Sequence, residues 1–376
     1  MRVVIAPDKF KGSLDAAGVA AALASGVRDV CPDADCVLLP MADGGDGTVA
    51  AFVASGARAR TVRVTGPLGT PVDATYARDG DTAVIEMAAA SGLVLAGTPL
   101  RPRRASTRGT GELLRDAVDG GAKRIVLGIG GSATTDGGAG ALAALGVRFF
   151  DGAGAELEAT PEALASVARV DLSGLDGRLR STDVAVACDV DNPLLGPSGA
   201  AAVYGPQKGA SADDVRFLDA MLARLADAVA AATREDLCDA PGAGAAGGLG
   251  WALAATCGAR LERGVDLIAK ARGLARQLHG ARWCFTGEGR IDAQTLHGKV
   301  VDGVARVAHD AGVRVVAFGG AVDAGAERAL RARGVTCMPI AAAPQTLDEA
   351  VHGTAANLRR AAARAAALLC HGEDVR

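Results

Sequence analysis

Short apolar runs alternate along the chain with segments of helical period, and this alternation is the feature that most constrains the fold. The apolar runs predict strands over residues 3–6, 37–40, 83–87, 124–129, 184–188, 282–286, 314–318 and 336–340. The periodic segments predict helices over residues 13–27, 111–118, 138–145, 212–232, 300–311 and 347–369. Strands that alternate with helices indicate an α/β fold with a mainly parallel sheet. Ligands of such folds bind at the carboxyl ends of the strands.

The chain has 376 residues, enough for two domains of ordinary size, and 49% of them are hydrophobic, enough for a substantial core. Its net charge of −3 argues against a general binder of nucleic acid or of anionic membranes, because both need a basic excess. We expect no signal peptide, since the first strand has no basic and long apolar segment before it. The longest uncharged run, 240–259, is mostly glycine and alanine and predicts a loop entering a helix rather than a membrane span.

The cysteines and histidines indicate neither a disulfide scaffold nor a zinc site. The eight cysteines form no CxxC pair, and the five histidines lack the spacing of zinc ligands. We therefore expect reduced, mostly buried thiols, which suits a cytoplasmic protein.

Lysine is rare in this chain, and its placement is informative. Only six of the 40 basic residues are lysine, and four of those six lie in glycine-rich turns. Lysine and arginine differ in phosphate geometry, so lysines kept in such turns favour anion-binding loops. Chance placement in turns is the alternative.

Two loops in the N-terminal part combine charges with glycine where a strand leads into a helix. Lys9 and Lys11 lie beside a predicted helix N-terminus with Ser13 as N-cap, which favours an anion site. Asp43 and Asp46 follow the second strand among glycines, which suits a Mg²⁺ ion or the orientation of a hydroxyl group. The alternatives are a surface turn with solvated charges and an Asp/Gly turn.

The loop at 128–138, GIGGSATTDGG, carries the strongest signal. Backbone N–H groups in such a turn form a nest for phosphate oxygens, and its hydroxyl groups add donors. We assign phosphate contacts in this loop to Gly128, Gly130, Gly131, Ser132 and Thr134. No Walker A motif occurs, but the loop matches GxGxxA loosely, with Asp151 at the distance of a ribose contact. A NAD-dependent oxidoreductase of a small hydroxy acid therefore stays open as an alternative.

Further polar residues gather after the predicted strand at 184–188. Asp189, Asp191 and Asn192 suit Mg²⁺ ligation or a general base for a hydroxyl group, with an Asp-Asn-Pro turn as the alternative. The same segment runs on to Lys208 in a Gly-Pro-Gln-Lys-Gly turn, where we expect a phosphate contact.

Three more glycine-rich loops have open interpretations. Arg108 lies in a loop that suits a phosphate or a carboxylate, although a capping box around Thr110 explains it nearly as well. The loop at 242–248 allows either close approach to a ligand or helix packing through small residues. The last connection brings Arg290 and Lys299 together with acidic and amide side chains near a helix start.

Taken together, these loops resemble the glycerate kinase family of the bacterial sugar-acid type, over nearly the whole chain. The motifs, in order, are APDKFKGSL from Ala6, PMADGGDGT from Pro40, GTGELL from Gly109, GIGGSATTDGGAGALAALG from Gly128, CDVDNPLLGPSGAAAVYGPQKGA from Cys188, GAGAAGGLG from Gly242 and GEGRIDAQTLHGK from Gly287. The chain departs from the family pattern at Thr135, where asparagine is usual, and at Val301, where proline is common.

The resemblance implies a flavodoxin-like parallel-sheet domain built from both chain ends, 1–65 and 282–376, with a second α/β domain inserted at 66–281. It places the active site in the cleft between these domains. It also implies ATP-dependent phosphorylation of D-glycerate to 2-phosphoglycerate with Mg²⁺. We expect small-molecule partners only, no nucleic acid and no membrane, and a monomer or homodimer.

In this hypothesis the 128–138 loop and lysines cradle the ATP phosphates. The candidate catalytic residues are Asp189, Asp191, Lys9, Lys11 and Asp43, of which Asp189 and Asp43 are the metal ligands. The candidate substrate contacts are Asp46, Arg108, Arg290, Asn192 and Lys299. A non-catalytic sensor of sugar acids or nucleotides is a third hypothesis, which the several acidic loops disfavour.

Overall fold

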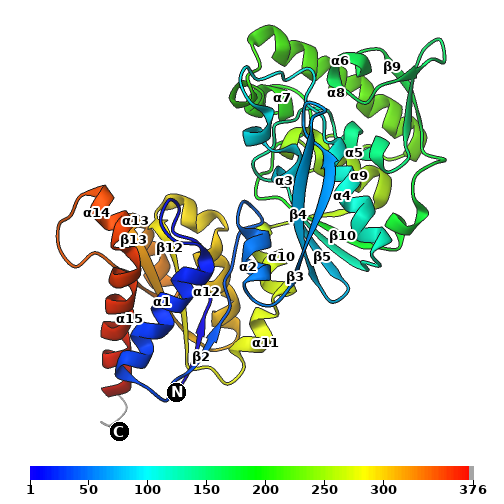
Figure 1. Cartoon of the computed structure of the whole chain (residues 1–376). Coiled ribbons are helices and arrows are strands. Elements are labelled where there is room, and N and C mark those ends of the chain that lie inside the picture. Colours follow the sequence, from blue (N-terminus) through cyan, green and yellow to red (C-terminus); the bar gives the residue numbers. More distant parts are fainter. Residues whose placement is uncertain (372–376) are drawn as a thin grey trace. The chain divides into compact units, whose positions relative to one another are not determined.

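The computed structural model describes residues 1–371. The chain forms two compact units, which Figure 1 draws as ribbons. The terminal unit comprises Met1–Asp43, Ala50–Gly56 and the chain from Arg263 onward, and the inserted unit comprises Gly44–Val49 and Ala57–Glu262.

The terminal unit contains a five-stranded, fully parallel sheet in the order β14-β13-β12-β1-β2. Its strands are β1 (Arg2–Ile5), β2 (Asp35–Leu38), β12 (Trp283–Ile291), β13 (Arg314–Val322) and β14 (Val335–Pro339). Counted along this unit alone the order is 2-1-3-4-5, which is the flavodoxin-like order. The inserted unit interrupts the chain between the second and third of these strands. The predicted α/β fold with a parallel sheet is confirmed, and the strands of this sheet come from both ends of the chain.

The core of the terminal unit follows from its sequence pattern. Val3, Val4 and Ile5 are all fully buried, as expected of a parallel strand covered on both faces. The helices of this unit include α1 (Ala16–Val30), α12 (Val300–Asp310), α13 (Ala324–Ala332) and α15 (Thr354–His371). The two helices nearest the chain ends, α1 in blue and α15 in red, lie side by side in Figure 1. They touch at Gly26, where a Cβ atom would lie 2.0 Å from the carbonyl oxygen of Arg359, so only glycine permits this approach.

The inserted unit contains a six-stranded mixed sheet in the order β11-β10-β6-β5-β4-β3. Its parallel strands are β5 (Thr82–Glu86), β6 (Arg124–Gly128), β10 (Asp183–Ala187) and β11 (Arg260–Glu262), and its antiparallel part is formed by β3 (Arg58–Thr65) and β4 (Pro71–Asp79). A separate antiparallel sheet holds β7 (Arg148–Asp151), β8 (Glu156–Leu157) and β9 (Val167–Asp171). The helices include α4 (Arg108–Asp119), α5 (Ala139–Ala144), α8 (Ala212–Thr233) and α9 (Leu249–Cys257).

The boundaries predicted near 65 and 282 differ from this division of the chain at three segments, 44–49, 57–65 and 263–281. β3 pairs with β4 over its whole length and therefore belongs to the inserted unit. Helix α10 (Gly264–Ala271) belongs to the terminal unit, where Asp266 pairs with Arg306 of α12.

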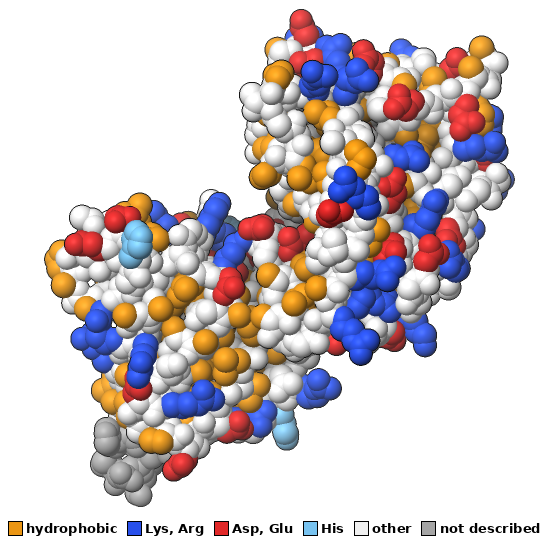
Figure 2. Space-filling view, viewed as in Figure 1, with side chains coloured by type: hydrophobic (Ala, Val, Ile, Leu, Met, Phe, Trp, Pro, Cys, Tyr) orange, Lys and Arg blue, Asp and Glu red, His pale blue; other side chains and the backbone are white. Residues whose placement is uncertain are grey.

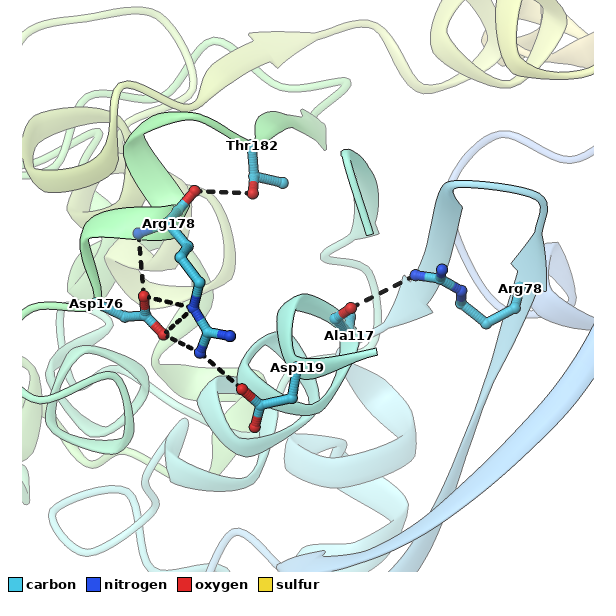
Figure 3. A network of polar contacts seen from close by, with 6 residues as sticks. All are labelled: Arg78, Ala117, Asp119, Asp176, Arg178 and Thr182. Atoms are coloured by element: carbon cyan, nitrogen blue, oxygen red, sulfur yellow. Dashed lines mark hydrogen bonds and ion pairs between the residues drawn. The ribbon is translucent and has the colours of Figure 1, made fainter. Parts of the chain in front are cut away.

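An arginine-centred network ties together the carboxyl-terminal end of α4 and the short helix η2 (Gly177–Arg180), as Figure 3 shows. Arg178 pairs with Asp119 and with Asp176, each at 2.6 Å. Arg78 of β4 donates to the carbonyl oxygen of Ala117 at 3.4 Å. These contacts join neighbouring elements of the inserted unit, and we interpret them as structural.

The predicted strands are all present. Six of them differ from the prediction by one or two residues at their ends, whereas β12 and β13 extend five and four residues beyond the predicted ends at 286 and 318. The helix predicted at 347–369 is two helices, α14 (Leu347–His352) and α15, because Gly353 ends the first. Ser13 is not the N-cap of α1; Asp15 caps this helix by accepting from the N–H group of Gly18, while the Ser13 hydroxyl donates to the Val351 carbonyl oxygen.

Six cysteines are free thiols, as predicted, but only Cys257 and Cys284 are buried and the other four are half-buried. The prediction is wrong for Cys31, which is disulfide-bonded. Burial raises the pKa of the Cys284 thiol to about 12.

Over residues 1–371 no helix combines the length and the apolarity that a membrane crossing demands. Basic and acidic side chains alternate over the face shown in Figure 2, as expected from the near-balanced charge.

Candidate active site

The carboxyl ends of β1, β2 and β12 bring three predicted loops together in the terminal unit. The N–H group of Asp8 donates to the carbonyl oxygen of Gly287 at 2.8 Å, and that of Met41 donates to Pro7 at the same distance. The loops after β1, after β2 and within the long β12 therefore share one edge of the sheet, as expected for a ligand site of this fold.

Three carboxylates of these loops influence one another. Burial raises the pKa of Asp8 to about 7, and the neighbouring carboxylates of Asp43 and Glu288 add to this effect. Burial also raises the pKa of Glu288 to about 7, against the effect of the hydrogen bond that it accepts from the Thr295 hydroxyl. Asp43 was predicted, whereas Asp8 and Glu288 were not, although both lie in motifs that the sequence analysis quotes. Raised carboxylate pKa values of this kind are frequent at catalytic sites.

The predicted cations of the terminal unit surround these loops. The Lys9 ammonium group lowers the pKa of Asp8, and Lys299 lowers that of Glu288. Lys299 donates to the Gln294 side-chain oxygen at 3.1 Å, and Arg290 pairs with Asp292 at 3.2 Å. Lys11 is exposed on the loop after β1.

The donor set suits a hard divalent cation that keeps most of its own water. Among residues 1–371, no group of three or more His, Cys, Asp or Glu side chains is arranged as a ready metal site. Mg²⁺ needs no such cage, because one or two carboxylates and the substrate phosphates commonly hold it. Asp43, with Asp8 and Glu288 beside it, offers carboxylate oxygens of this type.

The loop at 128–138 leaves β6 of the inserted unit, and its tip is open to solvent. Gly130 and Gly131 are exposed and Ser132 is half-buried, so this tip is accessible to a ligand, as the predicted phosphate contacts require. A Cβ atom on Gly128 would lie 2.1 Å from the carbonyl oxygen of Gly44, which requires glycine there. The loop that carries the exposed Asp46 thus lies directly against this phosphate loop.

Asp136 anchors the base of the phosphate loop. Its fully buried carboxylate accepts from the Thr107 N–H group at 2.7 Å and from the Thr107 hydroxyl at 2.8 Å. It also accepts from the N–H groups of Gly138 at 3.1 Å and Gly140 at 3.2 Å. Burial raises the pKa of Asp136, and these hydrogen bonds oppose the rise. The carboxylate joins the loop, α4 and α5 into one rigid assembly.

Two predicted phosphate contacts, Thr134 and Lys208, lie beneath the loop rather than at its tip. Lys208 is 2% exposed and donates from Nζ to the Thr134 carbonyl oxygen at 2.6 Å. Burial lowers the pKa of Lys208 to about 7, and the Asp136 carboxylate acts in the opposite direction. The Thr134 and Thr135 hydroxyl groups are buried, and neither has a hydrogen-bond partner among the described residues. Direct phosphate contact by Thr134 and Lys208 stays a prediction, which this burial disfavours.

The glycine-rich loop at 242–248 packs against the phosphate loop. Ala246, Gly247 and Gly248 have positive φ values of 51°, 70° and 96° in succession. The Gly247 carbonyl oxygen accepts from the N–H group of Gly137 at 2.9 Å. These residues thus allow a close approach to the backbone of the 128–138 loop, and close approach of the 242–248 loop to a ligand stays a prediction.

The loop after β10 presents its acidic residues to solvent. Asp189 and Asp191 are exposed, in keeping with a role toward a ligand. The Asn192 side chain forms hydrogen bonds within its own segment of the chain. Its N–H₂ group donates to the Ser198 carbonyl oxygen at 2.8 Å, and its oxygen accepts from the Tyr204 hydroxyl at 2.6 Å. Asn192 as a substrate contact stays a prediction.

The loop before α4 differs from its capping-box alternative. The helix begins at Arg108 with Thr107 as N-cap. The Thr107 hydroxyl donates to the Asp136 carboxylate and makes no capping hydrogen bond to α4. The Thr110 hydroxyl instead bonds with Ser91 at 2.8 Å. Arg108 pairs with Glu112 at 3.3 Å and lines a pocket with two other arginines.

The dinucleotide alternative fails on the geometry around Asp151. It requires a parallel strand that ends at this residue, whereas β7 belongs to the small antiparallel sheet. The Asp151 carboxylate accepts from the N–H groups of Ala153 and Ala155 and so closes the β7–β8 turn. Its position after a glycine-rich loop is a coincidence of spacing.

The two sheets and their loops define an α/β protein with an exposed glycine-rich loop after β6 and clustered carboxylates at strand ends. Comparison with known proteins identifies its family. The sequence model of the glycerate kinase family matches residues 3–370. Glycerate 2-kinase of Escherichia coli K12 is 45% identical over 99% of each chain, and glycerate kinase of Bacillus subtilis 168 is 50% identical over 86% of each. A crystal structure of a Salmonella typhimurium LT2 protein described as glycerate kinase 2 aligns over the whole of both chains, with a TM-score of 0.89 and 44% identity.

The chain belongs to the glycerate kinase family. The resemblance drawn from the seven motifs is confirmed. The similarity to the Salmonella structure over the full length also agrees with the α/β fold found here.

Proposed function

We propose that the chain is an ATP-dependent kinase that transfers the γ-phosphoryl group of ATP to the 2-hydroxyl group of D-glycerate, giving ADP and 2-phosphoglycerate. The family membership and its relatives named glycerate kinase and glycerate 2-kinase support this activity. Nothing supports the oxidoreductase alternative, since its structural requirement at Asp151 is not met.

One observation about the site carries the proposal. The tip of the 128–138 loop is exposed, while its base is fixed by the Asp136 carboxylate and the Lys208 ammonium group. Phosphoryl transfer depends mainly on positioning and charge neutralisation, so a preformed nest on a rigid base is the device it needs. In the proposal Gly130, Gly131 and Ser132 bind ATP phosphate oxygens, and Lys208 and Thr134 hold the loop in place.

The carboxylates supply the remaining chemistry. In the proposal Asp43 and Asp189 are the candidate ligands of Mg²⁺, which when bound neutralises phosphate charge. Asp189 and Asp191 are candidate bases for the glycerate hydroxyl proton. Asp8 is a further candidate, because its pKa of about 7 suits proton transfer near neutral pH.

Cations of the terminal unit suit the carboxylate of the substrate. Arg290 can bind a carboxylate through two parallel hydrogen bonds, and Lys299 can bind it as a point charge. Lys9 and Lys11 are proposed to stabilise negative charge on the phosphoryl group during transfer. The interdomain cleft, the cytoplasmic location and the choice between monomer and homodimer stay predictions.

The test is glycerate-dependent ADP release from Mg-ATP by the purified wild type and by Asp189→Asn, Asp191→Asn and Asp8→Asn. We expect robust turnover by the wild type and a loss of about 100-fold or more in kcat for the variant that removes the base. Circular dichroism and the unfolding midpoint serve as the fold control. Tight binding of glycerate without turnover by the wild type would instead identify a sensor.

A further inference from the structure

A pocket of about 230 Å³ in the inserted unit is lined by three arginines, Arg101, Arg104 and Arg108. It lies between the β3–β4 turn, the segment before α4, the start of α5 and the segment before the short helix α6 (Pro161–Leu164). No step of the proposed reaction uses Arg101 or Arg104.

The charges of this pocket are not balanced by the protein. Glu158 is the only carboxylate among its lining residues, against three guanidinium groups. The guanidinium groups of Arg101 and Arg104 have no hydrogen-bond or ion-pair partner among residues 1–371. By contrast, the guanidinium group of the neighbouring Arg103 is paired: it contacts Asp214 at 2.5 Å and stacks on the Phe217 ring. A concave surface with unpaired guanidinium groups favours an anionic ligand.

The floor of the pocket is preformed. Ser106 and Gly140 both line it, and a Cβ atom on Gly140 would lie 2.0 Å from the Ser106 hydroxyl oxygen. Thr107 follows Ser106 and, like the N–H group of Gly140, donates to the buried Asp136 carboxylate. Because this floor is held by the core, ligand binding needs little ordering of it.

Size and charge together define the ligand class. The volume lies below the roughly 300 Å³ at which pockets for drug-sized ligands begin, so the enclosed space suits a ligand smaller than a whole nucleotide. Arginine matches phosphate and carboxylate oxygens with two parallel hydrogen bonds. A phosphate monoester carries about 1.5 to 2 negative charges at neutral pH, which complements the surplus of guanidinium groups.

We propose that this pocket is a binding site for a small phosphorylated acid, separate from the sites for ATP and D-glycerate. The binding part of the proposal is independent of the proposed kinase activity, because it rests on the pocket alone. It assigns Arg108 to this ligand rather than to the glycerate carboxylate.

The test is calorimetric titration of inorganic phosphate and of 2-phosphoglycerate at constant ionic strength. The pocket variant is Arg101→Ala/Arg104→Ala, and the matched control is Arg58→Ala/Arg224→Ala, which removes two exposed arginines of the same unit outside the pocket. We expect phosphate to bind the pocket variant at least about tenfold more weakly than the wild type, and the control within about twofold. We expect 2-phosphoglycerate to lose one of two binding events in the pocket variant.

Equal phosphate affinity in all three proteins would overturn the proposal. A rise in the KM for D-glycerate that parallels the loss of phosphate binding would also overturn it, because the pocket would then be the substrate site. Absence of kinase activity in the wild type contradicts the proposed function but leaves the titrations, and so the pocket proposal, fully testable.

Discussion

Lys208 donates from its buried Nζ to the backbone carbonyl oxygen of Thr134 at 2.6 Å. This hydrogen bond holds the base of the 128–138 loop, whose tip at Gly130 and Gly131 is exposed. The lysine is the last residue of η3 (Pro206–Lys208), which is far from Thr134 in sequence. A buried ammonium group is costly unless it is paired, so its retention here points to positioning of the loop.

Replacing Lys208 by methionine keeps most of the side-chain volume and removes the charge. We expect kcat/KM for ATP to fall by about 10- to 100-fold, because a small displacement of the phosphate nest weakens the alignment of the reacting groups. Steady-state kinetics with varied ATP is the measurement. The control is Lys270→Met, an exposed lysine at the end of α10, for which we expect wild-type kinetics. Wild-type kcat/KM in Lys208→Met would contradict a positioning role.

Asp136→Asn tests the anchor of the same loop. The carboxylate accepts four hydrogen bonds, and an amide group cannot accept at its nitrogen, so buried donors lose their partner. We expect the free energy of unfolding to fall by about 2–4 kcal/mol, measured by urea denaturation. Asp119→Asn breaks the exposed pair with Arg178 in Figure 3, and we expect a change below about 1 kcal/mol. Equal effects of the two substitutions would show that Asp136 is no special anchor.

Gly247→Ala tests the contact between the two glycine-rich loops. A Cβ atom would lie 2.2 Å from the Thr134 carbonyl oxygen, and the backbone has a φ of 70°. Gly258→Ala is a matched control, since its φ is 71° but no atom lies within 4 Å of the added Cβ. We expect a cost of about 1–2 kcal/mol for the control, from backbone strain alone, and a clearly larger one for Gly247→Ala. Similar unfolding midpoints for both variants would contradict the close packing.

The carboxyl group of Asp8 predicts a particular dependence of stability on pH. Its pKa rises from 3.8 to about 7 on folding, so between these values the native state binds more protons than the unfolded state. Its contribution to the free energy of unfolding is therefore complete below about pH 4 and is lost as the pH rises through 7. Asp8→Asn has no such group, so its stability relative to the wild type increases between pH 5 and 8, by about 2–3 kcal/mol. Parallel pH profiles of the two proteins would contradict this assignment.

The strands that form the centres of both sheets could be predicted from sequence, because each is a short apolar run next to a glycine-rich loop. The strands β3 and β4 were missed, since exposed and charged residues, such as Arg60 and Arg63, interrupt the apolar pattern of this edge hairpin. β7 to β9 were missed because they form a small sheet of short strands.

The loops of the site could be found from sequence, but the roles inside them could not. Glycine spacing identifies a phosphate nest, yet it does not reveal which side chains point inward. Lys208 and Thr134 are buried beneath the loop, while Asp8 and Glu288 gain their raised pKa values from neighbours far away in sequence. Such relationships depend on tertiary packing, which no local pattern encodes.

The most direct test of the central claim is to incubate the purified protein with Mg-ATP and D-glycerate and to pass the product to enolase without phosphoglycerate mutase. The account predicts glycerate-dependent ADP release and a product that enolase consumes at once, because the phosphoryl group is on the 2-hydroxyl. A product that enolase consumes only after mutase is added would place the phosphoryl group on the 3-hydroxyl. No glycerate-dependent ADP release would contradict the assignment as a glycerate kinase.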